Sequence, residues 1–144
     1  INMEDRLPGE SELLPIAEAQ ARYRAAADTG IFVNARCDVF RGQDAAKDGD
    51  ALVAATLERA RAYHDAGAGS LFVPFLLDPK CIGAICEASP LPVNILRGKG
   101  GPTHKELAGL GVGRISHGHQ SWAGAMEWLT GQAKQVFGGA EPDY

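Results

Sequence analysis

The sequence predicts an α/β protein built on a parallel β-sheet. Short apolar segments of strand length alternate with longer amphipathic segments along all 144 residues. This alternation is typical of βα units, whose right-handed crossovers make the strands parallel. Polar residues follow several of the apolar segments, at the points where the strands would end. Because parallel strands end at one edge of the sheet, where α/β proteins build their sites, we expect a ligand site at that edge.

Five segments have the length and composition of strands, and they lie at residues 1–5, 31–38, 70–74, 92–96 and 112–116. The second opens with an apolar run, 31–33, that we expect to be buried. Asn34 and Arg36 share one face of this strand because side chains alternate along it. An amide beside a fixed cation at a strand end indicates a carboxylate or phosphate site. The alternative is a structural ion pair between Arg36 and Asp38.

Five helical segments follow the strands, at residues 16–28, 50–66, 78–88, 103–110 and 122–137. The second is the clearest, with Asp50 as its expected N-cap and apolar residues recurring at helical spacing. Arg59 falls on the polar side of this pattern, so we expect it to face solvent. The polar, glycine-bearing segment 41–49 predicts a long loop, and residues 138–144 predict a frayed tail.

Composition excludes several classes of function. The formal net charge is −4, and the chain has no basic stripe of the kind that binds nucleic acid. It also has no run of about eighteen apolar residues, so we expect no membrane span. The three cysteines form no Cys-x-x-Cys pair, and we interpret them as reduced thiols of a cytoplasmic protein. The chain starts at Ile1, inside a predicted strand, so we expect a segment in front of it.

Two architectures are compatible with five parallel strands. A domain of about 100 to 150 residues can form a complete open sheet of the flavodoxin type. However, no glycine-rich phosphate loop follows the first strand, and polar residues face one way on several strands, as at the mouth of a barrel. A (β/α)₈ barrel needs about 250 residues. The barrel interpretation therefore requires residues 1–144 to be the C-terminal part of a single barrel domain.

Six short motifs occur in one order along most of the chain, and they are Ile1-Asn-Met-Glu-Asp5, Asn34-Ala-Arg-Cys-Asp38, Ala62-Tyr63 through Ala66-Gly-Ala68, Phe72-Val-Pro74, Pro92-Val-Asn94 and Leu110-Gly-Val-Gly-Arg-Ile-Ser116 followed by Gly118. Together they resemble the isocitrate lyase and phosphoenolpyruvate mutase superfamily. The resemblance covers the chain from Ile1 to about Ala133. It implies a TIM-type (β/α)₈ barrel in which this chain supplies about strands 4 to 8.

The resemblance also implies roles for individual residues. Glu4 matches a glutamate that helps to hold a catalytic Mg²⁺ (or Mn²⁺), often through water, and Asp5 is a weaker metal-binding candidate. Arg36 matches the arginine that grips the carboxylate or oxyanion of the substrate, so Glu4 and Arg36 are the catalytic candidates. Asn94 matches a polar position near a second acid group. Further substrate-binding candidates, chosen by their place at strand ends, are Asn34, Ser116 and His117.

The activity implied by the resemblance is that of a Mg²⁺-dependent lyase or mutase. Such an enzyme acts on a small 2-oxo or 2-hydroxy acid through a pyruvate-enolate-like intermediate, and a hard cation with a nearby arginine stabilises the developing negative charge. Carbon–carbon cleavage is the leading prediction. Phosphonomutase activity and oxaloacetate hydrolysis or decarboxylation are alternatives. In this family the last helices commonly pack on a neighbouring subunit, so helix 122–137 predicts a homodimer or homotetramer.

The sequence departs from the family in two places. The paired metal-binding aspartates belong to earlier strands and have no match in this chain. The loop 6–15 lacks the Cys and Lys that the carbon–carbon lyases carry there, and it does not match the lysine-rich loop of the phosphonomutases. These departures leave a second class of function open, in which a catalytically degenerate barrel serves as an anion-binding or scaffold protein.

Overall fold

A computed structural model describes residues 1–144, in which five strands alternate with five helices. The strands are β1 (Asn2–Glu4), β2 (Asn34–Arg36), β3 (Ser70–Val73), β4 (Val93–Leu96) and β5 (Arg114–Ser116). The helices are α1 (Ile16–Ala27), α2 (Ala45–Asp65), α3 (Pro79–Ala88), α4 (His104–Gly109) and α5 (Gln120–Phe137). All neighbouring strands pair in parallel, in the order β1-β2-β3-β4-β5. The predicted α/β class with a parallel sheet is confirmed.

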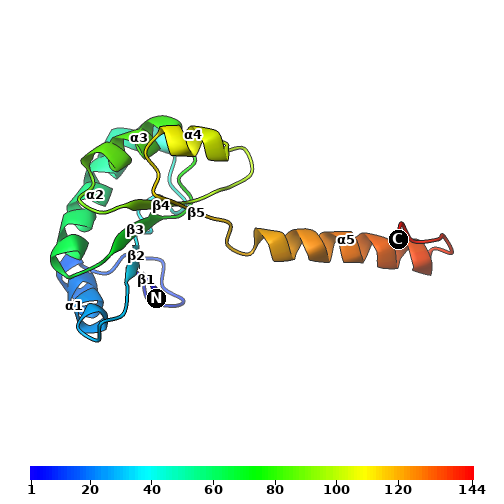
Figure 1. The fold of residues 1–144 in the computed structure, drawn as a ribbon, viewed down its shortest axis with the longest axis horizontal. Helices are drawn as coiled ribbons and strands as arrows, with labels where there is room; N and C mark the ends of the chain where they lie inside the picture. The colour runs from blue at the N-terminus through cyan, green and yellow to red at the C-terminus, as the bar shows by residue number, and fades with distance from the viewer.

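The sheet is curved, and α1 to α4 cover its outer side (Figure 1). Its strand order follows the chain order, whereas an open flavodoxin-type sheet reverses direction at a switch point and has helices on both faces. Strand register aligns Glu4, Arg36, Phe72, Asn94 and Arg114 in one row across the sheet. Because side chains alternate along strands, this row lies on the face opposite the helices. The architecture is therefore part of a barrel wall, with the aligned row on the barrel's inner face.

Helix α2 begins earlier than the sequence predicts. Asp44, and not Asp50, caps it by accepting a hydrogen bond from the backbone N–H of Ala46 at 3.0 Å. Asp48 has non-helical backbone angles (φ −116°, ψ 17°), so the helix is kinked there. The predicted loop 41–49 is therefore wrong for its second half. The side chain of Asp44 satisfies a free N–H group, which lets a polar, glycine-bearing segment form a helical turn.

The apolar run before β2 is only partly buried. Val33 has no exposed surface, but Ile31 and Phe32 are 46% and 60% exposed. The prediction that the whole run 31–33 is buried is therefore wrong. β2 begins only at Asn34, so the first two residues precede the paired strand at the edge of the sheet opposite the predicted site.

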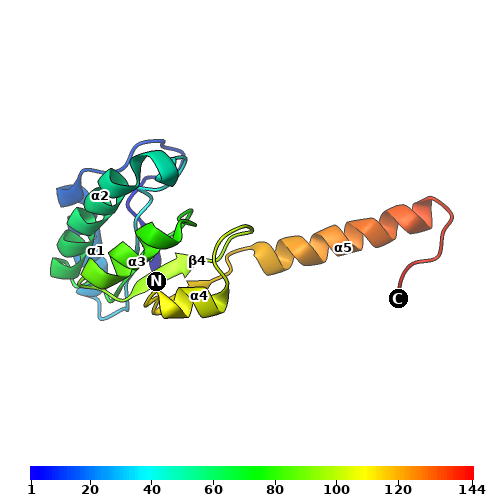
Figure 2. The same cartoon turned by 90° about the horizontal axis from the view of Figure 1, so that it is seen from above.

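Helix α5 stands apart from the rest of the chain. It projects as a rod away from the sheet and the other helices, and both views show this (Figures 1 and 2). Several of its large apolar side chains are exposed, with Trp122 at 65%, Trp128 at 53% and Phe137 at 90%. Neither α5 nor any other helix combines the length and apolar character needed to cross a bilayer. The frayed tail after Phe137 stays a prediction.

Candidate functional site

The ends of β1 and β2 carry a cluster of charged side chains. Arg36 donates from Nη1 to Glu4 Oε1 at 2.7 Å, and it binds Asp38 with two hydrogen bonds, Nε to Oδ1 at 2.6 Å and Nη2 to Oδ2 at 3.0 Å. Burial opposes the charge of Arg36, but the hydrogen bonds and negative charges of its partners raise its pKa above the usual value. A guanidinium has five N–H donors, so two of them remain free. The ion pair with Asp38, which was the alternative to an anion site, is present, and Arg36 also contacts Glu4.

A buried network of Asp5, Arg59 and Tyr63, here called the support network, lies beneath this cluster. Asp5 Oδ1 accepts a hydrogen bond from the backbone N–H of Asp38 at 2.9 Å. Asp5 Oδ2 accepts from the Tyr63 hydroxyl at 2.7 Å and from Arg59 Nη1 at 3.3 Å. Burial and the nearby charge of Asp5 raise the pKa of Tyr63 well above its usual value, so its hydroxyl stays a donor. The network thereby ties α2 to the segment that holds Arg36 in place.

Arg59 is not on the solvent side of α2, contrary to the prediction. Its side chain is only 11% exposed, and its Nη1 also donates to the Tyr63 hydroxyl at 3.0 Å. The two residues are four positions apart and so lie on the same side of the helix. The long side chain of Arg59 reaches past the apolar stripe to Asp5, which the helical pattern does not reveal.

The carboxylates differ in their fitness for a divalent cation. Asp5 has no exposed surface and both of its oxygens accept hydrogen bonds, so this geometry gives no support to its predicted contact with a metal. The Glu4 side chain is 44% exposed, and only its Oε1 is hydrogen-bonded. Mg²⁺ commonly uses one or two carboxylates and keeps several waters, so Glu4 fits as one ligand or as a water-bridged partner. Residues 1–144 hold no group of three His, Cys, Asp or Glu arranged for a metal.

Asn94 in β4 and Ser116 at the end of β5 are neutral polar residues. The Ser116 hydroxyl donates to Asn94 Oδ1 at 3.0 Å, while Asn94 Nδ2 is buried without a hydrogen-bond partner. A buried amide without an acceptor is costly, so this Nδ2 is an unsatisfied donor on the inner face. Asn34 lies deeper than Arg36, at the start of β2, where its Oδ1 accepts from the Ser70 hydroxyl at 2.7 Å. Asn34 and Ser116 line a cavity of about 250 Å³.

His117 is separate from both groups. Its ring packs edge-on against His104 with centroids 5.2 Å apart, and it forms no hydrogen bond with the other candidate residues. The side chain is exposed. Substrate contact by His117 stays a prediction.

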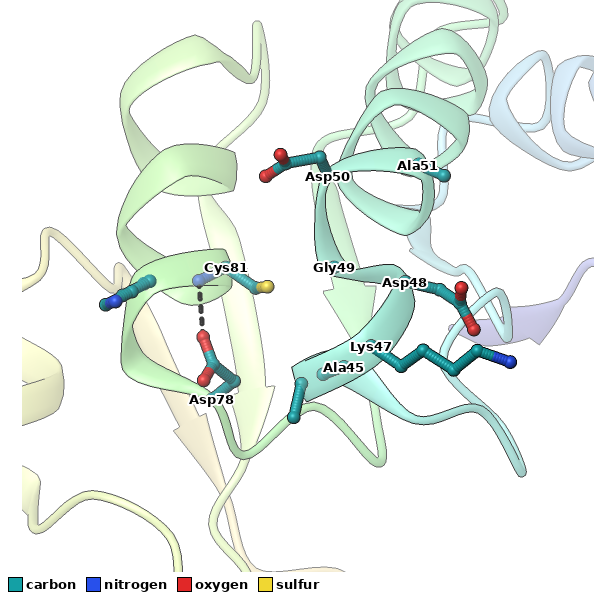
Figure 3. Close-up of a pocket in the computed structure, with 10 residues that line it drawn as sticks. Ala45, Lys47, Asp48, Gly49, Asp50, Ala51, Asp78 and Cys81 are labelled. Atoms are coloured by element: carbon teal, nitrogen blue, oxygen red, sulfur yellow. Dashed lines mark hydrogen bonds between the residues drawn. The ribbon is translucent and has the colours of Figure 1, made fainter.

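A cavity of about 590 Å³ lies between the first turns of α2 and α3, away from the predicted site residues (Figure 3). It is lined in part by Cys81, and a Cβ at Gly49 would come within 3.0 Å of the Cys81 sulfur. Burial and the neighbouring Asp78 raise the pKa of Cys81 to about 11, so its thiol is protonated at neutral pH. Burial also raises the pKa of Cys37, which has no exposed surface. Neither thiol is set up as a nucleophile.

Three residues near Asp38 were not singled out from the sequence. Arg6 Nε and Arg41 Nη1 both lie 3.6 Å from Asp38 Oδ2. Phe75 follows β3 with a positive φ of 66°, and its ring centroid lies 5.7 Å from the Arg36 guanidinium and 5.8 Å from that of Arg41. The arginines follow predicted strands, which is a signal that could have identified them. The backbone angle of Phe75 has no such signal.

The fold and site together define part of a (β/α)₈ barrel whose strand ends carry a guanidinium–carboxylate cluster. The model of the phosphoenolpyruvate phosphomutase family matches residues 1–137, and the chain belongs to this family. The resemblance inferred from the motifs is thereby confirmed.

Known relatives support the same assignment. A protein of Burkholderia cenocepacia J2315, provisionally described as a phosphonomutase, is 46% identical, with a TM-score of 0.87 over 94% of this chain and 56% of its own. An uncharacterized protein of Mycobacterium tuberculosis is 32% identical over 98% of this chain and 52% of its own. The fold also matches 2,3-dimethylmalate lyase, at 20% identity and a TM-score of 0.77 over 99% of this chain and 52% of that one. The chain spans about half the length of these relatives.

Proposed function

We propose that the whole protein is a Mg²⁺-dependent lyase or mutase that acts on a small 2-oxo or 2-hydroxy acid through a pyruvate-enolate-like intermediate. Carbon–carbon bond cleavage is the leading reaction. The observation that carries the proposal is the fixed position of Arg36 at the end of β2, where Glu4 and Asp38 hold it and leave two N–H donors free. A guanidinium fixed in this way stabilises an oxyanion without needing to reorganise during the reaction.

Each candidate residue of this chain has its own role in the proposed reaction. Arg36 binds the carboxylate or the developing oxyanion, and Asn94 donates from its unpartnered Nδ2 to another substrate oxygen. Arg36 and Asn94 are two strands apart in the same row, so about 10 Å separates their backbones. When bound, Mg²⁺ (or Mn²⁺) would polarise the 2-oxo group. Glu4 would hold it directly or through water, together with ligands from outside this chain.

Two other reactions are alternatives within the same class. The description of the Burkholderia relative favours phosphonomutase activity. Oxaloacetate acetylhydrolase shares the fold at 20% identity, with a TM-score of 0.75, and oxaloacetate hydrolysis or decarboxylation remains the other alternative. A function from another class is favoured by the loop 6–15, which lacks both Cys and Lys. Without that acid–base group, the barrel would bind an anion or act as a scaffold.

Pyruvate release from a panel of 2-oxo and 2-hydroxy acids tests the proposal, with Mg²⁺ present or removed by a chelator. We expect release to require the cation and to fall by about a hundredfold or more in Glu4→Gln and Arg36→Ala, since each removes one electrostatic contact to the reacting groups. Arg36→Lys keeps the charge and tests the same position with a variant whose folding is less affected than that of the alanine variant. Arg61→Gln, on the exposed side of α2, is the matched control.

Unchanged release in the Glu4 and Arg36 variants would contradict the site assignment. Anion binding without any product would instead support the scaffold alternative. Phosphonopyruvate formed from phosphoenolpyruvate would replace the lyase assignment with the mutase.

We also propose that the whole protein is a homodimer or homotetramer in which α5 packs on a neighbouring subunit. The exposed Trp122, Trp128 and Phe137 support this, because large apolar patches on monomers are uncommon. Light scattering after size exclusion tests it. We expect Trp122→Glu with Trp128→Glu to lower the mass to that of a monomer, and an unchanged mass would contradict the proposal.

A cytoplasmic location is proposed on the state of the cysteines. Cys37, Cys81 and Cys86 are all free, and free thiols are typical of a reducing compartment. Cell fractionation tests this location, and recovery of the protein outside the cytoplasm would contradict it.

A further inference from the structure

Arg6 is a buried cation that lacks hydrogen-bond partners. It is only 8% exposed, its Nε is buried without a partner, and it donates no hydrogen bond. Its nearest acidic atom is Asp38 Oδ2, at 3.6 Å. Removing a guanidinium from water is costly unless its donors are satisfied. Nε itself has no accessible surface, so the Nη groups of Arg6 are the donors that an acceptor from outside the chain can use.

Arg41 adds a second guanidinium to the same place. Its Nη1 is also 3.6 Å from Asp38 Oδ2, and its side chain is 50% exposed. Asp38 already accepts two hydrogen bonds from Arg36. Three arginines thus share Asp38 and Glu4, which leaves one positive charge in excess. An excess of guanidinium charge with free donors favours an oxyanion, since the planar fork matches carboxylate and phosphoryl groups.

Phe75, which contacts two of these arginines, has a strained backbone conformation. Its ring is 47% exposed and lies within 6 Å of both Arg36 and Arg41. A bulky residue at φ 66° is strained, and such strain clusters at functional sites. An aromatic face holds guanidinium groups by cation–π contact and leaves their N–H edges open. Phe75 therefore fixes Arg41 beside Arg36 without using its donors.

We propose that Arg6 and Arg41 form an oxyanion subsite that binds the second acidic group, carboxylate or phosphoryl, of the substrate whose first acidic group Arg36 binds. This rests on the proposed function of Arg36. Asn94 brings hydrogen-bond donors but no charge to the inner face, whereas Arg6 and Arg41 bring both. The subsite makes the protein selective for diacids, because only a diacid engages Arg36 and the subsite together.

Calorimetric titration of the whole protein with acetate, malonate, succinate and inorganic phosphate tests the subsite. In Arg41→Gln we expect the Kd of the better-bound diacid to rise about tenfold or more, as for the loss of a charge-assisted hydrogen bond, and that of acetate to change less than twofold. Arg6→Gln should act in the same direction. Because Arg41 is half exposed, its variant should fold even if the Arg6 variant does not. Arg61→Gln should bind every probe as the wild type does.

Several results would overturn the subsite. One is a wild-type protein that binds neither diacid better than acetate, and another is an Arg41→Gln variant with unchanged diacid affinity. A diacid affinity that depends on Asn94→Ala but not on Arg41→Gln would place the second acidic group at Asn94. Phosphate binding that depends on Arg41 but not on Arg36 would mean a site for a free anion. Failure of the proposed function is distinct, because acetate binding would then be unaffected by Arg36→Lys and Arg36→Ala.

Discussion

The edge of the sheet at which the strands end is built differently at β1 and β2, here called the charged end, and at β4 and β5, here called the neutral end. At β1 and β2, Arg36 is ion-paired with Glu4 and Asp38. At β4 and β5, the corresponding contact is a neutral hydrogen bond between Ser116 and Asn94. Charged groups removed from water must be paired and hydrogen-bonded, whereas a neutral amide tolerates a single partner at smaller cost. The charged end therefore needs a scaffold behind it that the neutral end does not.

That scaffold is the support network. Asp5 binds the backbone N–H of Asp38, and Arg59 with Tyr63 fixes Asp5 from α2. The Tyr23 hydroxyl adds a hydrogen bond to the backbone carbonyl of Arg36 at 3.0 Å. The difference between the ends teaches that holding one mostly buried cation in place requires a second layer of buried charge. Substitutions at the two ends should therefore differ in the size of their effects and in whether they change stability or binding.

Asp5→Ala should have the largest effect on stability. It leaves the mostly buried Arg59 without its carboxylate, and removing one partner of a buried ion pair costs about 3 to 5 kcal/mol of unfolding free energy. Urea denaturation measures the change. Asp65→Ala removes an exposed carboxylate on the same helix and should change stability by less than about 0.5 kcal/mol. Equal effects of the two substitutions would show that the support network does not stabilise the ends of β1 and β2.

Tyr63→Phe should have the next largest effect. It removes the hydroxyl that donates to Asp5 at 2.7 Å while keeping the ring, and a hydrogen bond to a charged group contributes about 2 kcal/mol. A double-mutant cycle with Arg59→Met should show coupling of about 0.5 kcal/mol or more, because both residues share Asp5. Strictly additive effects would mean that the two residues act independently.

Asn94→Ala should lower substrate affinity more than it lowers the free energy of unfolding. Its Nδ2 has no partner within the protein, so its loss removes a donor that is free for a ligand, and the only internal hydrogen bond lost is the neutral one from Ser116, worth about 1 kcal/mol. We expect substrate affinity to fall about tenfold, as for one hydrogen bond to a charged group. Steady-state assays check this by comparing the change in KM with the change in kcat. A variant with unchanged KM and kcat would remove Asn94 from the site.

Ser116→Ala should have the smallest effect. It removes the hydroxyl that donates to Asn94 Oδ1, a neutral hydrogen bond that contributes about 1 kcal/mol. Thermal unfolding should show a decrease of a few degrees for a chain of this size. A loss as large as that of Asp5→Ala would refute the distinction between the charged and the neutral end.

Much of the fold could be predicted because it depends on local patterns. The alternation of apolar runs and helical periodicity gave the number and parallel direction of the strands, whereas their order in the sheet followed only from the barrel that the family resemblance implies. The predicted start of segment 103–110 is close to that of α4, which Thr103 caps, with the side chain of Glu106 accepting from its backbone N–H at 2.7 Å. The errors lie at boundaries, where Asp44 replaced Asp50 as a cap and Phe32 stayed outside the strand. Boundaries depend on single hydrogen bonds, which periodicity does not report.

The candidate site was predictable only in part. Glu4 and Arg36 were expected to converge because both end parallel strands, and their register makes them direct neighbours. Arg59 and Tyr63 could not be connected to Asp5, because their partner lies more than fifty residues earlier and no local pattern marks the contact. The strained backbone of Phe75 was equally invisible, since its neighbours in sequence predict an ordinary strand end.

The sequence by itself determined the class of fold, the family and the strand-end position of Arg36, because these follow from periodicity and from motifs of adjacent residues. Only the tertiary structure decided which carboxylate each arginine meets. The Glu4–Arg36 contact joins residues 32 positions apart, and the Arg59–Asp5 contact joins residues 54 positions apart. Such pairs form only when strand register and helix packing bring distant segments within hydrogen-bonding distance.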